Sequence, residues 1–261
     1  MTLPPLYPII DFSCFAVRPD PVAAIIAYAE ELIAAGATLI QLRDKSQPER
    51  TRRFLSCARE LRRVTWGAGT TPRATLIVND RVDICLAANA DGVHLGQSDL
   101  SPVAARRVFD SMLFDSVISH VPGTPTPWVP HPFAAKALQS SELPSERVGE
   151  QTAVATRKQL LIGFSTHNLS QLREADALPI DYIAIGPVFA TASKATPDPV
   201  VGLEGVRQAR RVTKKPLVAI GGITRQNCSQ VKAAGADAVA VISDLLESPA
   251  KAVADFLRVL G

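Results

Sequence analysis

Short apolar runs rich in β-branched residues alternate with longer segments of helical period along most of this 261-residue chain. Such alternation is typical of parallel strands joined by crossover helices. The predicted strands are Tyr7–Asp11, Thr38–Leu42, Thr75–Val78, Gly92–Leu95, Leu160–Gly163, Tyr182–Ile185, Pro216–Ile220 and Ala238–Val241. The predicted helices include Pro21–Ala35, Pro48–Arg63, Ser101–Phe109, Ser170–Ala175, Gly202–Arg211 and Asn227–Ala234. Eight strands in a chain of about 250 residues predict an α/β fold, a (β/α)8 TIM barrel formed as a single domain over residues 1–261.

Three of the helices run into a similar turn before the next strand. The segments AAGATLIQL, AANADGVHL and AAGADAVAV each place Gly or Asn directly after the helix. Gly36 and Gly235 suit the left-handed conformation that ends many helices, and Asn89 tolerates it. The recurrence indicates one structural unit used several times.

The segment from Asp110 to Lys158 interrupts the pattern between the fourth helix and the fifth strand. It is rich in proline, mainly within HVPGTPTPWVPHP, and is too long for an ordinary connection. Because it follows a helix and precedes a strand, it is interpreted as an insertion, residues 110–158, on the side of the barrel away from chemistry. A lid over the site or an arm that binds a partner is the alternative.

The composition of the chain limits which binding partners and which cellular compartment are expected. The net charge is only +3, and basic and acidic residues are interleaved, so no nucleic-acid partner is expected. The four cysteines form neither a CxxC pair nor a Cys/His cluster, which argues against a zinc site or a disulfide framework. The amino terminus lacks the features of a secretory signal, and no apolar run approaches about 20 residues. The chain is therefore expected to be cytoplasmic, with no membrane partner and with its oligomeric state open.

Charged and polar residues gather where the second, third and fourth strands end, which is where barrels of this type place their chemistry. Gln41, Arg43 and Lys45 alternate after the second strand, so that the two basic side chains could hold phosphate oxygens. Asp80 and Asp99 follow the third and fourth strands, and two such carboxylates can hold one Mg²⁺. The alternatives are a solvated charged turn for the first group and helix caps for the two aspartates.

The remaining strand ends carry hydroxyl groups, histidines and glycines. His94 is interpreted as an oriented residue of the site wall, with a ligand as the alternative. Ser165 and His167 lack an acidic partner nearby in sequence, which disfavours a serine hydrolase. The loop GPVFATASK could close over phosphate or be an ordinary surface loop. Gly221-Gly222-Ile223 and Val241-Ile242-Ser243 follow the last two strands, where barrels commonly bind phosphate.

These segments together resemble the thiamine phosphate synthase family over nearly the whole chain apart from the Asp110–Lys158 segment. The resemblance is carried, in order, by QLRDK, NDRVDICLAANADGVHLGQSDL, GFSTHN, DYIAIGPVFATASK, AIGGIT and AGADAVAVIS. It implies a transferase of thiamine biosynthesis with Mg²⁺ as cofactor and two small-molecule substrates. That family joins hydroxymethylpyrimidine diphosphate to hydroxyethylthiazole phosphate and releases pyrophosphate, by a dissociative substitution.

The resemblance also implies a role for each matching residue. The pyrimidine diphosphate would be held by Gln41, Arg43, Lys45 and Asn79, with Ser165 at its reacting part, and Mg²⁺ by Asp80 and Asp99. The thiazole phosphate would be bound by Thr191, Ser193, Gly222, Ile242 and Ser243, and Lys194 would meet the pyrophosphate. The implied catalytic set is Ser165, Lys194, Arg43 and Lys45. Ser193 departs from the more usual threonine but keeps the hydroxyl group.

Two other functions are compatible with parts of this sequence. A thiazole tautomerase of the same barrel family would use a histidine near His167 and would not need a metal site for a diphosphate. A barrel that binds phosphate without catalysis, and acts through the proline-rich segment, is the other alternative. The Gln41, Arg43 and Lys45 group and the Asp80 and Asp99 pair favour the synthase over both.

Overall fold

The computed structural model describes residues 2–45, 51–67, 69, 71–118, 159–191 and 199–261. The chain divides into two units, Met1–Arg106 with Leu160–Gly261, and Arg107–Gln159. These boundaries lie close to those of the predicted insertion, although most of residues 110–158 lie outside the described residues. No helix in the described part of the chain is long and apolar enough to cross a bilayer.

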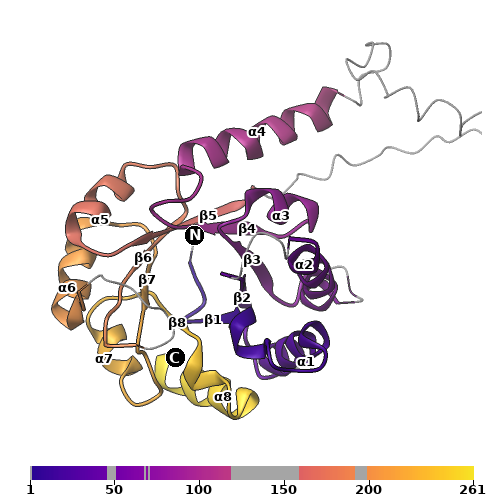
Figure 1. Ribbon diagram of the computed structural model, residues 1–261. Coiled ribbons are helices and arrows are strands. Elements are labelled where there is room, and N and C mark those ends of the chain that lie inside the picture. The colour runs from indigo at the N-terminus through magenta and orange to yellow at the C-terminus, as the bar shows by residue number, and fades with distance from the viewer. Residues whose placement is uncertain (1, 46–50, 68, 70, 119–158, 192–198) are drawn as a thin grey trace, which may run out of the picture. The chain divides into compact units, whose positions relative to one another are not determined.

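The first unit is a closed barrel of parallel strands surrounded by helices (Figure 1). The strands are β1 (Leu6–Asp11), β2 (Leu39–Arg43), β3 (Thr75–Asn79), β4 (Gly92–Leu95), β5 (Leu161–Thr166), β6 (Tyr182–Ile185), β7 (Leu217–Ile220) and β8 (Ala238–Val241). Each strand pairs with the next in parallel, and β1 closes the ring against β8, with Leu6 opposite Val239. All eight predicted strands and the (β/α)8 barrel are therefore confirmed, and β5 extends beyond its predicted end to Thr166.

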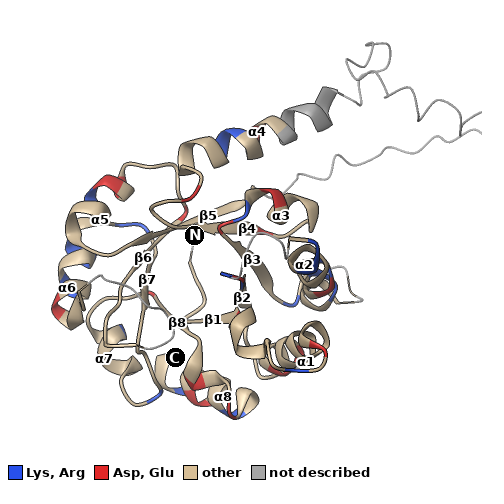
Figure 2. Ribbon diagram, viewed as in Figure 1, with Lys and Arg blue, Asp and Glu red and all other residues tan. Residues whose placement is uncertain are grey.

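The α-helices follow the strands around the outside of the barrel. They are α1 (Pro21–Ala34), α2 (Thr51–Trp66), α3 (Val82–Ala87), α4 (Pro102–Ile118), α5 (Leu169–Asp176), α6 (Gly202–Val212), α7 (Cys228–Ala233) and α8 (Pro249–Leu260). Two short 3-10 helices, η1 (Phe12–Phe15) and η3 (Ser243–Leu245), follow β1 and β8. The sequence analysis did not name α8 among its predicted helices. Figure 2 shows basic and acidic residues spread over several of these helices rather than collected on one.

Local sequence signals set where several helices begin and end. The Asp20 side chain accepts a hydrogen bond from the Ala23 N–H at 3.0 Å, and Pro21 fills the first helical position of α1. Gly36 and Gly235 both have φ of 107°, and Asn89 has φ of 54°. The predicted left-handed turns between helix and strand are therefore present at all three positions.

The interior of the barrel is filled by apolar side chains and two tyrosines. Tyr7 on β1 and Tyr182 on β6 are both fully buried, and their rings meet edge to face with centroids 6.0 Å apart. Gly163, opposite Tyr182 in the register of β5 and β6, leaves room for this ring. A Cβ atom at Gly163 would lie 2.0 Å from the Tyr182 ring. The barrel can hold a large polar side chain at its centre because its neighbour has no side chain.

Three strands are fastened at their amino ends by the same arrangement of an aspartate, a backbone N–H and an arginine. The aspartate stands directly before the strand, accepts a hydrogen bond from the preceding strand, and pairs with an arginine of the helix that leads into that preceding strand. The three sets are Asp91 with Leu76 and Arg62, Asp181 with Ile162 and Arg106, and Asp237 with Leu217 and Arg210, at distances of 2.7–2.9 Å. The same fastening thus recurs before β4, β6 and β8.

Burial should decide how much each of these sets stabilises the barrel. The Asp91 side chain is 7% exposed, whereas that of Asp237 is 46% exposed. We expect Asp91→Ala to lower the free energy of unfolding by about 3–5 kcal/mol, because it leaves the Leu76 N–H without a partner and the largely buried Arg62 without its carboxylate. Asp237→Ala should cost about 1 kcal/mol. Urea denaturation of both variants measures the difference, and equal losses would contradict the argument.

Candidate active site at the carboxyl ends of the strands

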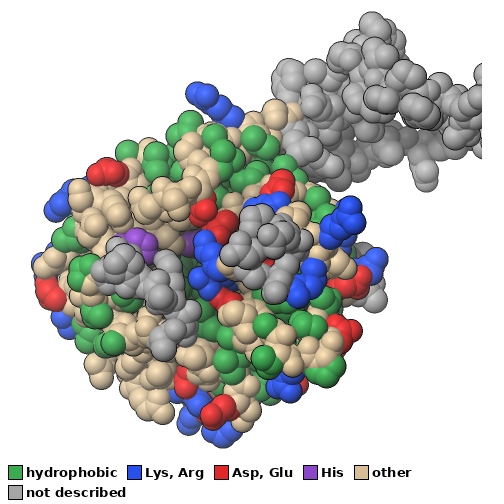
Figure 3. Space-filling view, viewed as in Figure 1, with side chains coloured by type: hydrophobic (Ala, Val, Ile, Leu, Met, Phe, Trp, Pro, Cys, Tyr) green, Lys and Arg blue, Asp and Glu red, His purple; other side chains and the backbone are tan. Residues whose placement is uncertain are grey.

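A cavity of about 440 Å³ opens at the carboxyl ends of the strands and is lined by residues from all eight of them. Every predicted site residue that the structure describes lines it: Gln41, Arg43, Lys45, Asn79, Asp80, Asp99, Ser165, Thr191, Gly222, Ile242 and Ser243. Ser193 and Lys194 lie outside the described residues. Figure 3 shows histidine, basic and acidic side chains together near the middle of this face. The cavity thus brings these predicted residues together from seven separate stretches of the sequence.

Arg43 and Lys45 lie on the cavity wall, and each already has an acidic partner. The Arg43 guanidinium is paired with Asp11, which is 3% exposed and stands at the end of β1. The other oxygen of Asp11 accepts hydrogen bonds from the backbone N–H and the hydroxyl of Ser13, at 2.9 and 2.6 Å. The Lys45 ammonium is paired with Asp80. The sequence analysis missed Asp11, whose only signal was an acidic residue at the end of a predicted strand.

Asp80 directly follows β3, Asp99 lies on the loop after β4, and the two side chains interact. Asp80 has φ of 62°, and its N–H donates to the His94 carbonyl at 2.7 Å, which turns the side chain toward the cavity. Asp99 accepts a hydrogen bond from the Gly96 N–H at 2.7 Å. Burial and the adjacent Asp99 carboxyl raise the pKa of Asp80 to about 6, although Lys45 opposes the shift. A negative charge on both Asp80 and Asp99 is therefore unfavourable in this cavity.

Neither aspartate caps a helix, so the alternative interpretation of Asp80 and Asp99 as helix caps is wrong. The residue that precedes α3 is Arg81, and no side chain caps that helix. Before α4, the Ser101 hydroxyl accepts from the Ala104 N–H at 3.2 Å, so that serine and not Asp99 is the cap. Both carboxylates remain available to the cavity.

The pair fits a magnesium ion that also contacts its substrate. Mg²⁺ in proteins is usually held by one or two carboxylates, with phosphate oxygens and water in its other positions. No group of three or more acidic, histidine or cysteine side chains suited to a metal occurs among the described residues. The crowding that raises the pKa of Asp80 is the kind that a divalent cation relieves. The donor set would bind the ion weakly alone and more tightly together with a diphosphate.

The amide of Asn79 is aimed at the same place. Asn79 ends β3, is 6% exposed, and lines the cavity. Its Nδ2 atom is buried and has no hydrogen-bond partner. A buried donor without a partner costs free energy, so such a group commonly marks a position that a ligand satisfies. An oxygen of an anionic ligand would satisfy it here.

A chain of hydrogen bonds crosses the barrel beneath the cavity and ends at Ser165. Gln41 Nε2 donates to the Tyr7 hydroxyl at 2.9 Å, and the Tyr7 and Tyr182 hydroxyls are 2.8 Å apart. His94 Nδ1 lies 3.1 Å from the Tyr182 hydroxyl, and its Nε2 lies 2.8 Å from Ser165 Oγ. Burial raises the pKa of both tyrosines, which therefore stay neutral. The chain fixes the orientation of Gln41, His94 and Ser165 around one part of the cavity.

His94 thus orients its neighbours, as the sequence analysis had it, although the tyrosines that hold it were missed. Its ring also stacks on that of Tyr182, with centroids 5.6 Å apart. The group on the far side of His94 from Ser165 is a neutral phenol and not a carboxylate. The Ser165 and His94 pair therefore does not reproduce the arrangement of a serine hydrolase.

The opposite wall of the cavity is formed by backbone from the loops after β7 and β8. Gly221 and Gly222 have φ of 100° and 63°, and a Cβ at Gly222 would lie 2.5 Å from the Ala190 carbonyl oxygen. Only glycine allows this close approach of the loops after β6 and β7. Ile242 and Ser243 complete the wall after β8. We call Gly221, Gly222, Ile223, Ile242 and Ser243 the cradle, because backbone of this kind after the last two strands is the usual phosphate site of barrels.

His167 also lines the cavity, on the loop after β5. Its Nδ1 atom lies 2.8 Å from the Gly186 carbonyl oxygen, which fixes the ring against the end of β6. Its backbone N–H donates to the side-chain oxygen of Gln171 at 2.7 Å. Gln97 reaches across from the loop after β4 and donates to the Ser165 carbonyl at 2.5 Å. Gln97 and Gln171 were not predicted, because glutamine in a loop carries no distinctive signal.

Comparison with known proteins shows which family this chain resembles. A family model described as thiamine monophosphate synthase matches residues 13–114 and 144–245. Curated proteins named thiamine-phosphate synthase are similar along most of the chain. The one from Koribacter versatilis is 42% identical over 260 residues, covering 100% of this chain and 97% of that protein. The one from Chloroflexus aurantiacus is 35% identical over 217 residues, covering 83% of this chain and 76% of that protein.

Solved structures point the same way. The thiamine phosphate pyrophosphorylase from Pyrococcus furiosus superposes with a TM-score of 0.68 at 28% identity, covering 98% of this chain and 95% of that chain. A geranylgeranylglyceryl phosphate synthase from Thermoplasma acidophilum superposes with a TM-score of 0.55 at 12% identity, covering 98% of this chain and 92% of that chain. The second likeness concerns the fold alone.

The carboxylate pair should make the metal-free protein less stable at neutral pH. Because the pKa of Asp80 is raised from 3.8 to about 6, the stability this group contributes is fully present below pH 3.8 and is lost as the pH rises through about 6. In the presence of a chelator, Asp80→Asn should therefore raise the free energy of unfolding by about 1–3 kcal/mol near pH 7.5, and by less near pH 5.

Asp83 provides the matched control for this measurement. The neighbouring Arg81 lowers the pKa of Asp83, which is the opposite direction of shift. Asp83→Asn should therefore leave stability unchanged or reduce it slightly at neutral pH. Urea denaturation at both pH values measures the two variants, and the account fails if Asp80→Asn brings no gain near neutral pH.

Proposed function

The chain belongs to the thiamine monophosphate synthase family, and from that premise we propose that its cavity joins a pyrimidine diphosphate to a thiazole phosphate. The products are thiamine phosphate and pyrophosphate, which makes the protein a transferase of thiamine biosynthesis. The observation that carries the proposal is one cavity with two unlike anion sites. One is a carboxylate pair flanked by basic side chains, and the other is a cradle of glycine backbone. Two phosphorylated substrates that react with each other need such a pair of sites.

The side of the cavity formed by β2, β3 and β4 suits the pyrimidine diphosphate. Arg43 and Lys45 carry positive charge at its wall, and Asn79 offers an unpaired N–H donor. Asp80 and Asp99 would hold Mg²⁺, which when bound supplies positive charge to the diphosphate oxygens. In this proposal Lys45 exchanges its partner, from the Asp80 carboxylate in the free protein to the diphosphate in the complex. Lys194, which lies outside the described residues, would add a further positive charge at the pyrophosphate.

The reacting carbon would lie between the two anion sites, near Ser165. Gln41, His94 and Ser165 form an ordered polar surface there, fixed by the two buried tyrosines. Such a surface orients the amino group and ring nitrogens of an aminopyrimidine. No protein nucleophile is required, because an electron-rich aminopyrimidine can itself support a positive methylene carbon. Ser165 therefore acts by positioning the ring and not by attacking it.

The cradle on the side of β7 and β8 suits the thiazole phosphate. Its backbone N–H groups and the Ser243 and Thr191 hydroxyls can hold a phosphate monoester. Anchoring the phosphate would present the thiazole nitrogen to the methylene carbon as pyrophosphate leaves. Such positioning converts an encounter of two molecules into a reaction within one complex. Ser193, which also lies outside the described residues, would contribute a further hydroxyl group.

The nearest competing function is thiazole isomerisation at His167. That reaction needs neither the Asp80 and Asp99 pair nor the Arg43 and Lys45 group. These four side chains form the most charged part of the cavity, and a tautomerase would leave them without a task. The synthase proposal assigns a function to each of them.

Incubation of the purified protein with both phosphorylated substrates tests the reaction and its metal requirement. We expect thiamine phosphate and pyrophosphate only when Mg²⁺ is present. Asp99→Ala should lower turnover by about 100-fold or more, the effect of losing one group that stabilises charge in the transition state. Asp83→Ala, on the exposed side of the same region, should retain normal turnover. Isomerisation of the thiazole without metal and without coupling would instead support the tautomerase.

Asn79 allows binding and folding to be measured separately. Asn79→Ala should weaken binding of the pyrimidine diphosphate by about tenfold or more, because a hydrogen bond to a charged group is lost. It should lower stability little, since the Nδ2 atom has no partner in the free protein. Calorimetric titration with the substrate and urea denaturation give the two quantities. A variant that unfolds easily but binds normally would contradict this role.

A further inference from the structure

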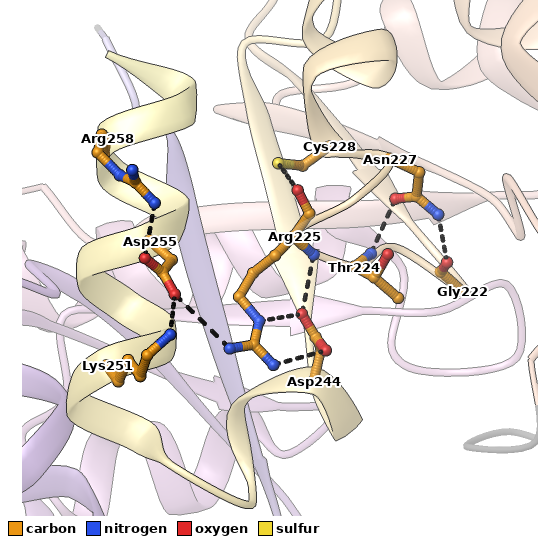
Figure 4. A network of polar contacts seen from close by, with 9 residues as sticks. All are labelled: Gly222, Thr224, Arg225, Asn227, Cys228, Asp244, Lys251, Asp255 and Arg258. Atoms are coloured by element: carbon orange, nitrogen blue, oxygen red, sulfur yellow. Dashed lines mark hydrogen bonds and ion pairs between the residues drawn. The ribbon is translucent and has the colours of Figure 1, made fainter.

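A network of polar contacts holds together the two loops that form the cradle (Figure 4). One loop follows β7 and carries Gly222, Thr224, Arg225 and Asn227, and the other follows β8 and carries Asp244 in η3. Asp255, Lys251 and Arg258 on α8 join the network from the outside. None of Arg225, Asn227 and Asp244 lines the cavity, so these residues would act on a ligand only through the cradle.

Asn227 sets the direction of one peptide of the cradle. Its Oδ1 atom accepts from the Thr224 N–H at 2.8 Å, and its Nδ2 atom donates to the Gly222 carbonyl at 3.0 Å. The Gly222 carbonyl is therefore turned toward Asn227. In a trans peptide the carbonyl and the next N–H point in opposite directions, so the Ile223 N–H points away from Asn227. Ile223 lines the cavity, and its N–H is in this way presented to a ligand.

Arg225 and Asp244 fix the spacing between the two loops. One oxygen of Asp244 accepts from both the backbone N–H and Nε of Arg225, at 2.8 and 3.0 Å. The other oxygen accepts from Nη2 at 3.4 Å. A pairing through two side-chain nitrogens and one backbone nitrogen constrains orientation as well as distance. Because Asp244 directly follows Ser243, this pairing sets the position of Ser243 relative to Gly222.

Arg225 has a second role, which is electrostatic and arises from the negative charge of Asp244. Asp244 is a carboxylate one residue from the cradle, and an unpaired carboxylate there would repel a phosphate. The Arg225 guanidinium neutralises it. Asp255 contacts the same guanidinium at 3.7 Å but lies on α8, and within the described part of the chain its hydrogen bonds go to Lys251 and Arg258 on the same helix and not to either loop backbone. Loss of Asp255 should therefore leave the cradle intact.

We propose that Arg225, Asp244 and Asn227 are positioning residues for the phosphate-bearing thiazole substrate. They hold the two loops of the cradle at a fixed spacing, and Arg225 cancels the negative charge that Asp244 would otherwise place beside the anion. The inference rests on the proposed function for the identity of the substrate. It does not depend on that function for the nature of the ligand, which is a phosphate monoester or inorganic phosphate.

Three single variants and one double variant test the proposal. Arg225→Ala removes the pairing between the two loops and leaves the Asp244 carboxylate unpaired. We therefore expect the KM for the thiazole phosphate to rise by about tenfold or more. Asp244→Asn keeps the shape without the charge and should raise this KM less. The double variant, Arg225→Ala with Asp244→Asn, should recover part of the loss because the repelling charge is gone. Asp255→Asn is the matched control and should change no kinetic constant.

The kinetic signature separates positioning from general destabilisation. The KM for the pyrimidine diphosphate should stay unchanged in every variant, and so should the kcat/KM for the unphosphorylated thiazole alcohol. Equal rises of KM for both substrates, or a double variant that is worse than Arg225→Ala, would overturn the proposal. Circular dichroism and urea denaturation check that each variant is folded, and Asp244→Asn, the mildest change, remains informative if Arg225→Ala is not.

Direct binding separates a failure of this inference from a failure of the proposed function. If the wild-type chain forms no thiamine phosphate, the proposed function fails. Calorimetric titration with inorganic phosphate then tests the cradle by itself. Binding by the wild type that is weakened in Arg225→Ala but not in Asp255→Asn upholds the inference. Equal binding by the two variants, or none by the wild type, overturns it.

Discussion

Two carboxylates, Asp80 and Asp99, are brought together at the wall of the cavity, and the proposed metal and diphosphate site depends on the repulsion between them. Parallel strands all end on the same side of a closed barrel, so the ends of β3 and β4 are neighbours. The left-handed conformation of Asp80 and the bond from Gly96 to Asp99 hold both groups in place. In the free protein, the raised pKa of Asp80 reflects this repulsion together with burial, and the ion pair with Lys45 opposes it. In the proposed function, a divalent cation bound with a diphosphate would relieve the repulsion more completely.

The polar groups at the two ends of the barrel differ in whether the protein itself supplies their partners. At the amino ends of the strands, Asp91, Asp181 and Asp237 each have an arginine and a backbone N–H as fixed partners, and their charges are satisfied within the protein. At the carboxyl ends, the Asn79 donor has no partner and Asp80 has a raised pKa. The first arrangement stabilises the fold, and the second stores unsatisfied polar groups for a ligand. The two tyrosines in the barrel interior hold Gln41 and His94 in place, and His94 in turn holds Ser165.

Much of this could be predicted from the sequence because strand ends and helix ends leave local signals. The eight strands, the left-handed turns at Gly36, Asn89 and Gly235, and the residues that line the cavity follow from alternation, glycine placement and polar residues after apolar runs. The partners of those residues could not be predicted in this way. Asp11 meets Arg43, and Tyr7 meets Tyr182, only because the barrel closes, and such pairs lie 32 and 175 residues apart. The pairing of Arg225 with Asp244 could not be predicted from the sequence for the same reason.

The central claim is that the Asp80 and Asp99 pair uses Mg²⁺ to hold a diphosphate in this cavity. Binding of pyrophosphate, the diphosphate product, measures this most directly, by calorimetry with and without Mg²⁺ on the wild-type chain and on Asp99→Ala. The account predicts binding by the wild type that requires Mg²⁺ and is lost in the variant. Pyrophosphate binding of equal strength without the metal, or with Asp99 removed, would contradict it.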